Sequence, residues 1–221
     1  MKNLIVFVHG AFVSRKSWNY LRHAIDVGLT ERNLGDAYDV SMFEYDVTTD
    51  LTEDITQDLV EVLKSEAKKY EKVWFVAHSY GGVVSVAAAR ELLKRDPSLN
   101  LEVISMATPF GGSEAASLMS ILKPRSTFIR NVGSVNRYML DFKSDALPCK
   151  VHALVTYKES SAWGWIENDG VVTVESELHF EKDPKFSYEF YNIAHTEVLL
   201  SEEIGSWLVD KLAVSNGAEM A

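Results

Sequence analysis

One serine in this sequence occupies a position suited to nucleophilic catalysis. Ser79 lies in AHSYGG, between the apolar run Val73–Ala77 and a segment with helical character. A serine on a tight strand-to-helix turn projects its hydroxyl outward, and small residues two positions away on either side let strand and helix cross closely. Ala77 and Gly81 meet that requirement. The alternative is a serine–glycine turn that only caps a helix, but the position after a buried strand favours a nucleophile.

A serine hydroxyl is a weak nucleophile until a base removes its proton, so a histidine is expected beside Ser79. His195 directly follows the last predicted strand and precedes a helix, which would place it at the same sheet edge as Ser79. The other five lie in turns, in an early helix, inside a strand and in a charged loop: His9, His78, His23, His152 and His179. We therefore expect His195 to be the base.

The base needs an acidic partner that holds its tautomer, expected after the preceding strand, Val151–Tyr157. Asp169 is the best candidate because Gly170 beside it allows a sharp turn. Asp169 can also be read as an ordinary turn aspartate. Three other carboxylates compete for the role: Glu159, Glu167 and Asp183.

Backbone N–H groups near Ser79 are candidates for an oxyanion hole. Tyr80 follows the serine at a helix N-terminus, where N–H groups and the helix dipole favour negative charge. After the first predicted strand, HGAF brings a glycine that permits close backbone approach. The second donor is expected to be the N–H of Ala11 or, one residue later, of Phe12, and His9 is expected to be structural.

Aromatic residues follow several of these motifs and are candidates to line a substrate pocket. We name Phe12, Phe110, Trp163 and Trp165, although such rings also commonly fill gaps between loops and helices. Residues 109–149 contain three prolines and two adjacent glycines, and we expect a small helical flap there.

Hydrophobic patterning predicts alternating strands and helices. Apolar or alternating runs predict six strands, at Leu4–Val8, Tyr38–Tyr45, Val73–Ala77, Leu101–Met106, Val151–Tyr157 and Tyr188–Ile193. Apolar spacing of three or four residues predicts helices at Ser17–Val27, Glu53–Tyr70, Val83–Arg95 and Glu202–Leu212. This alternation predicts a doubly wound α/β fold with a mostly parallel six-stranded sheet, whose working groups lie at the carboxyl ends of the strands.

Composition narrows the class of protein. The chain has 221 residues and 24% charged residues, with 22 basic and 32 acidic residues for a net charge of −10. That charge argues against nucleic acid and against stable association with anionic membranes. The single cysteine, Cys149, fits a reducing compartment, so we expect a cytoplasmic protein. The apolar run Leu4–Val8 is shorter than the roughly 7–15 residues of a signal-peptide core.

Together these motifs resemble the α/β-hydrolase superfamily, and within it the small bacterial lipases and esterases. The likeness extends from HGAF through AHSYGG, ATPFGGS and NDGVV to AHTEVL, in the order Ser79, Asp169, His195. It implies a minimal α/β-hydrolase fold in one domain over residues 1–221, with those three residues as catalytic nucleophile, acid and base. It also implies Ala11 and Tyr80 as oxyanion donors. TPFGGS has Phe110 and Gly111 where lipases tend to have histidine and arginine, which argues against long-chain triglycerides.

These observations predict a serine hydrolase that cleaves esters of short or medium acyl chains, with a small-molecule substrate and without a cofactor. We expect no metal site, because the acidic run Asp50–Asp58 lacks the glycine and ligand spacing of a calcium loop. The alternatives are a hydrolase fold used only for binding or sensing, a lipase or thioesterase acting on lipid-like acyl groups, and a different reaction on the same fold. The oligomeric state is left open.

Overall fold

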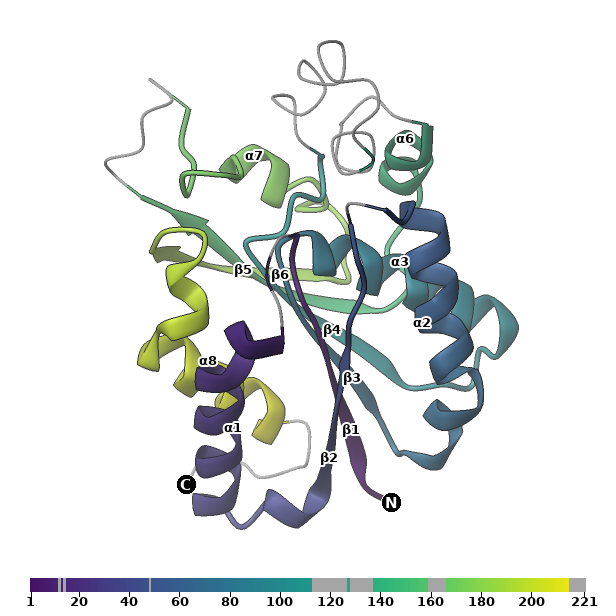
Figure 1. The fold of residues 1–221 in the computed structure, drawn as a ribbon, viewed down its shortest axis with the longest axis vertical. Helices are drawn as coiled ribbons and strands as arrows, with labels where there is room; N and C mark the ends of the chain where they lie inside the picture. Colours follow the sequence, from purple (N-terminus) through teal and green to yellow (C-terminus); the bar gives the residue numbers. More distant parts are fainter. Residues whose placement is uncertain are drawn as a thin grey trace.

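The computed structural model describes residues 1–11, 13, 15–47, 49–112, 127, 137–158 and 166–214. One six-stranded, all-parallel sheet runs through the centre, with helices on both faces (Figure 1). Its strands are β1 (Asn3–Val8), β2 (Tyr38–Phe43), β3 (Val73–His78), β4 (Leu101–Met106), β5 (Lys150–Tyr157) and β6 (Phe186–Asn192), in the spatial order β2-β1-β3-β4-β5-β6. The predicted fold class is confirmed.

Alternate side chains of the central strands enter two separate cores. In β1, Leu4, Val6 and Val8 belong to one core cluster, and Ile5 and Phe7 belong to the other. This follows from the two-residue period of a strand, because successive side chains point to opposite faces of the sheet. A continuous apolar run is therefore what a strand covered on both faces requires.

The helices form one layer on each face. α1 (Asn19–Glu31) and α8 (Glu202–Val214) lie side by side on one face, and α2 (Thr52–Glu66) and α3 (Tyr80–Arg95) cover the other (Figure 1). Two shorter helices, α6 (Arg137–Ser144) and α7 (Val174–Glu177), lie beyond the carboxyl ends of the strands. The described ranges also contain four 3-10 segments: η1 (Arg15–Trp18), η2 (Gly35–Ala37), η3 (Ala67–Lys69) and η4 (Glu197–Leu200).

Several predicted boundaries shift for identifiable reasons. β2 ends at Phe43 instead of Tyr45, because the N–H of Tyr45 donates to the imidazole of His9 instead of to a sheet neighbour. β6 begins at Phe186, which pairs with Val151, and not at Tyr188. α3 begins directly after Ser79, three residues before the predicted Val83.

Of the predicted flap, the structure describes only residues 109–112, 127 and 137–149. There, α6 buries Met139 and Phe142 in the same core cluster as α2 and α3. Residues 113–126 and 128–136 lie outside the described part of the chain, so the flap stays a prediction. No helix among the described residues has the length and apolar character needed to cross a membrane.

The start of α3 passes unusually close to β1. A Cβ atom at Gly81 would lie 2.3 Å from the carbonyl oxygen of Val8 and 2.6 Å from that of His9. At the next residue, a Cβ atom on Gly82 would lie 2.2 Å from Oγ1 of Thr108. The neighbours of Gly81 are backbone atoms and cannot rotate away, so this position accepts only glycine. The predicted need for a small residue two positions after Ser79 is confirmed.

The Gly81→Ala variant should therefore be less stable. We expect its free energy of unfolding to fall by about 1–3 kcal/mol, because the added methyl group forces helix and strand apart. Denaturant titration measures this. Lys94→Ala is the matched control, since Lys94 is exposed on the same helix and its ion pair with Glu91 is worth less than about 1 kcal/mol. Equal midpoints for Gly81→Ala and the control would contradict the close crossing.

Candidate active site

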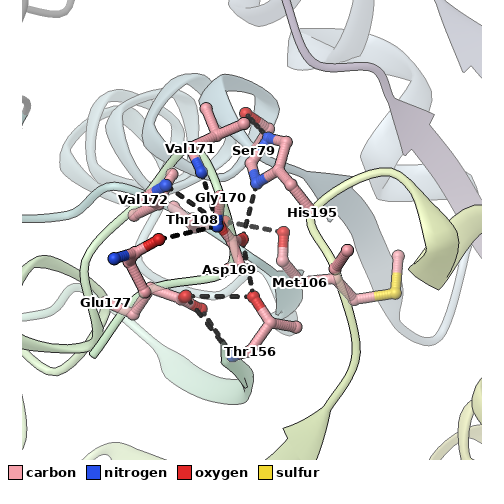
Figure 2. Close-up of polar contacts among 12 residues, drawn as sticks. Ser79, Met106, Thr108, Thr156, Asp169, Gly170, Val171, Val172, Glu177 and His195 are labelled. Atoms are coloured by element: carbon pink, nitrogen blue, oxygen red, sulfur yellow. Dashed lines mark hydrogen bonds and ion pairs between the residues drawn. The ribbon is translucent and has the colours of Figure 1, made fainter. Parts of the chain in front are cut away.

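Three side chains from separate parts of the chain meet at the carboxyl edge of the sheet. Nε2 of His195 lies 2.9 Å from Oγ of Ser79, and Nδ1 of His195 lies 2.7 Å from Oδ2 of Asp169 (Figure 2). All three are largely buried, with exposed fractions of 9% for Ser79, 7% for His195 and 2% for Asp169. The structure thus brings together the three residues that were singled out from the sequence, in a continuous line of hydrogen bonds.

Ser79 lies between β3 and α3 in a strained backbone conformation. Its φ of 54° and ψ of −130° fall in a region that residues with a side chain rarely adopt. The surroundings hold it there, because its N–H donates to the carbonyl of Met106 at 2.8 Å and its own carbonyl accepts the N–H of Gly82. This is the geometry expected of a nucleophilic serine on a tight strand-to-helix turn.

A tight loop fixes Asp169. Gly170 adopts a φ of +98°, and its N–H donates to the side chain of Asn168. The backbone carbonyl of Asp169 accepts the N–H of His195 at 3.1 Å. Acid and base are therefore joined through their backbones as well as through their side chains.

The carboxylate of Asp169 is saturated with hydrogen bonds. Oδ1 accepts the N–H groups of Val171 at 2.9 Å and Val172 at 2.7 Å, and Oδ2 accepts from His195 and from the hydroxyl of Thr156 at 2.8 Å. Burial by itself would raise the pKa of Asp169, but these hydrogen bonds, that of His195 foremost, hold the pKa below its usual value. Asp169 is therefore the ionised member of the group.

A second carboxyl group lies behind Asp169 and was not singled out from the sequence. Oε1 of Glu177, in α7, lies 3.0 Å from the hydroxyl of Thr156, and its two oxygens lie 3.3 and 3.2 Å from the N–H of Thr156. Glu177 is 2% exposed, and burial together with the charge of Asp169 raises its pKa well above the usual value. No local sequence motif marks Glu177 or Thr156, because the two residues meet only when α7 packs against the end of β5.

His78, next to the serine, supports the base from the other side. Its Nε2–H donates to the carbonyl of His195 at 2.8 Å, while no hydrogen-bond partner within the described part of the chain reaches its buried Nδ1. Burial, reinforced by the nearby His195, lowers the pKa of His78 to about 3. His78 is thus a neutral donor near pH 7.

The segment that carries the expected second oxyanion donor is held by His9. Nδ1 of His9 lies 2.7 Å from the carbonyl of Gly10, Nε2 accepts the N–H of Tyr45, and the ring stacks on Tyr45 with centroids 4.2 Å apart. The hydroxyl of Tyr45 also donates to the carbonyl of His9. A Cβ on Gly10 would lie 2.9 Å from Cβ of Ser79, so this segment, with Ala11 next in it, runs beside the serine.

Of the four aromatic residues predicted to line a pocket, the structure describes only Phe110. Phe110 is 1% exposed and packs edge-on against Phe180 and Phe186, so it is a core residue and does not line an open pocket. Phe12, Trp163 and Trp165 lie outside the described residues, and their role as pocket residues stays a prediction.

The rival acids do not approach His195 within the described residues. Glu167 is exposed, and Asp183 accepts the N–H groups of Leu147 and Lys185 in a loop of its own. Glu159 lies outside the described residues. Across the ranges that the structure describes, no three histidine, cysteine, aspartate or glutamate side chains are grouped so as to hold a metal ion.

The first part of this chain matches a known protein family. Residues 1–139, more than half of the chain, match the family described as "Putative serine esterase (DUF676)". The matched region contains Ser79 and both expected oxyanion segments but ends before Asp169 and His195, which are linked to the serine by the geometry above. No curated protein sequence matches this chain significantly.

Solved structures of hydrolases share the fold. The mature lipase BlEst2 of Bacillus licheniformis is 22% identical, with a TM-score of 0.66 over 96% of this chain and 91% of that one. The Pyrococcus furiosus esterase PF2001 is 16% identical, with a TM-score of 0.61 over 96% and 82%. Phospholipase PlaB of Legionella pneumophila is 12% identical, with a TM-score of 0.73 over 95% and 59%. This chain spans only about half of PlaB, 44% and 59% in two structures, and identities this low show the fold alone.

The buried His78 should make the folded chain less stable at acidic pH. Its pKa is about 3 in the folded chain and near 6.5 when unfolded, so the unfolded chain takes up a proton first as the pH falls. The contribution of neutral His78 to the free energy of unfolding is therefore complete above pH 6.5. It is lost as the pH falls from 6.5 to 3.

We expect the native chain to lose up to about 1.4 kcal/mol of unfolding free energy per pH unit in this window, relative to His78→Gln. Glutamine keeps an N–H donor for the carbonyl of His195 and does not titrate. Denaturant titrations of both proteins from pH 7 to pH 4 measure the difference. Parallel stability curves would contradict the assignment of a neutral His78.

Proposed function

The chain belongs to the DUF676 serine esterase family, and on that premise we propose that it hydrolyses carboxylic esters through an acyl-enzyme on Ser79. The observation that carries the proposal is the unbroken line from Ser79 through His195 to Asp169, with spacings of 2.9 and 2.7 Å. The premise supports a serine hydrolase, and the geometry supports the roles of the three residues.

In the proposed mechanism, Oγ of Ser79 attacks the ester carbonyl while Nε2 of His195 takes the hydroxyl proton and then gives it to the leaving alcohol. Asp169 accepts the Nδ1–H bond, holds the productive tautomer and stabilises the imidazolium that forms. A water molecule, activated by the same imidazole, then releases the acid and restores the serine. The ionised, hydrogen-bonded state of Asp169 supports this role.

The N–H groups of Tyr80 and Ala11 are proposed to bind the oxyanion. The N–H of Tyr80 begins α3 and so has no acceptor within its helix, and the dipole of this 16-residue helix favours negative charge at that end. The segment of Ala11 lies beside the serine, because Gly10 approaches Ser79 so closely that a Cβ atom on Gly10 would lie 2.9 Å from Cβ of Ser79. Both donors come from backbone that is fixed before the substrate arrives, which makes such stabilisation effective.

We propose small-molecule esters with short or medium acyl chains as substrates. The net charge of −10 disfavours anionic lipid surfaces and nucleic acid as partners. The lone Cys149 is buried, and burial raises the pKa of its thiol to about 12, so it has no part in the chemistry. An unpaired cysteine fits a reducing compartment, and the cytoplasm is the location we propose.

Replacing the nucleophile tests the mechanism. Ser79→Ala should lower kcat for a p-nitrophenyl ester by at least about 10³-fold, and the Ser79→Ala/His195→Ala double variant should lose no more than that, because residues acting as a unit are not additive. A fluorophosphonate probe should label Ser79 in the native chain. Unchanged turnover in Ser79→Ala would sink the proposal, and the absence of an adduct would favour a binding or sensor protein.

The acyl preference is a separate prediction. In a series of p-nitrophenyl esters from acetate to palmitate, we expect kcat/KM to be highest for short or medium chains. Initial rates at substrate concentrations below micelle formation measure this, with Ser79→Ala subtracted as background. A maximum at the longest chains would instead identify an enzyme for lipid-like acyl groups.

A further inference from the structure

The hydroxyl of Thr156 has one proton but two carboxyl groups within hydrogen-bonding distance. Oγ1 lies 2.8 Å from Oδ2 of Asp169 and 3.0 Å from Oε1 of Glu177. Both contacts are drawn as dashed lines in Figure 2. If both carboxyl groups were ionised, one of these contacts would place two lone pairs against each other. A proton must therefore come from one of the two acids.

Asp169 is the worse place for that proton. Apart from Thr156, three N–H groups point at its carboxylate: two backbone N–H groups at Oδ1 and the imidazole of His195 at Oδ2. These N–H groups stabilise a negative charge, and a neutral acid would weaken all three bonds. Among the described residues, Glu177 faces only one N–H group, that of Thr156.

Glu177 has a place for it. With the proton on Oε1, the acid donates to Oγ1 of Thr156, and Oε2 remains free to accept the N–H of Thr156 at 3.2 Å. Within the described part of the chain, no lysine, arginine or histidine pairs with Glu177, whose side chain is buried against β5. An unpaired carboxylate is costly in such a place, whereas a neutral acid with both oxygens bonded is not. Burial and the charge of Asp169 both raise the pKa of Glu177, in agreement with the geometry.

We infer that Glu177 is a positioning residue that remains protonated near neutral pH and donates to Thr156, so that Thr156 in turn donates to Asp169. The donor chain then runs from Glu177 through Thr156 to Asp169, which accepts from both Thr156 and His195. Glu177 acts on the hydrogen bonding of Asp169 and touches neither the substrate nor the reacting atoms. This inference rests on the proposed esterase function for its kinetic consequence, but not for its claim about the proton.

A neutral Glu177 has two consequences. It fixes the hydroxyl of Thr156 toward Asp169, which restricts the carboxylate to the orientation that His195 needs. It also leaves Asp169 as the only charged member of this pair of acids behind the imidazole. A second ionised carboxylate there would repel Asp169 and favour a proton shared between the two acids.

Two variants separate protonated from ionised Glu177. Glu177→Gln is nearly isosteric, donates through its amide N–H to Thr156 and accepts the N–H of Thr156 through its oxygen. If Glu177 is neutral, this variant keeps kcat/KM within about 3-fold of the native value and leaves the acid limb of the pH profile in place. Glu177→Leu and Thr156→Val remove the donor chain and should each lower kcat roughly 10- to 100-fold with little change in KM. Thr156→Ser keeps the hydroxyl, so it should keep the donor chain and a kcat near the native value.

Infrared difference spectroscopy reads the proton without any turnover. At pH 7.5, the native-minus-Glu177→Gln spectrum should contain the C=O stretch of a protonated carboxylic acid. The native-minus-Thr156→Ser spectrum is the control. Both proteins keep Glu177, so the band should cancel and be missing from that spectrum. Since Ser79→Ala retains Glu177, it should retain the band too, so that failure of the esterase proposal and failure of this one remain distinguishable.

Two outcomes would overturn the inference. If the band is missing and Glu177→Gln moves the acid limb to lower pH, Glu177 is ionised and its negative charge helps to hold the protonated base. If the band is present but folded Thr156→Val and Glu177→Leu turn over at native rates, Glu177 is only a buried structural acid. A band that Glu177→Gln removes, with kinetic loss confined to the variants lacking the donor chain, supports the inference.

Discussion

The carboxylate of Asp169 accepts hydrogen bonds from three separate parts of the chain, and the arrangement of the site depends on that convergence. Its own loop supplies two N–H groups, β5 supplies the hydroxyl of Thr156, and His195 arrives from beyond β6. A buried carboxylate is stable only when its oxygens are satisfied in this way. The same bonds that keep Asp169 ionised therefore also determine where the imidazole lies.

The parallel sheet provides the frame for this convergence. Because all six strands run in the same direction, the turns after β1, β3, β5 and β6 open at one edge. The backbone of Ser79 is held in its strained conformation by a hydrogen bond to the end of β4 and by the start of α3, which passes within contact of β1 at Gly81. Strain at the serine is thus balanced by packing around it, as is common where a side chain must be held rigidly.

Much of the fold was predictable because each strong signal had one local cause. The apolar run at β1 and the three- and four-residue spacing in α2 each report which faces are buried, and the structure has both elements where the patterns indicated. The weaker predictions failed where a tertiary contact decided the outcome. β2 stops early because His9 takes the N–H of Tyr45, and Phe110 turns into the core because Phe180 and Phe186 enclose it.

The order and types of residues determined the six strands, their alternation with helices and the identity of Ser79, Asp169 and His195 as a candidate site. Those features follow from periodicity and from short turns whose geometry demands glycine or small residues. The sequence favoured Asp169, but only the tertiary structure could decide against Glu167 and Asp183, or link Glu177 to the site through Thr156. An acid's role depends on its burial and on the donors it faces, and both arise when distant segments pack together.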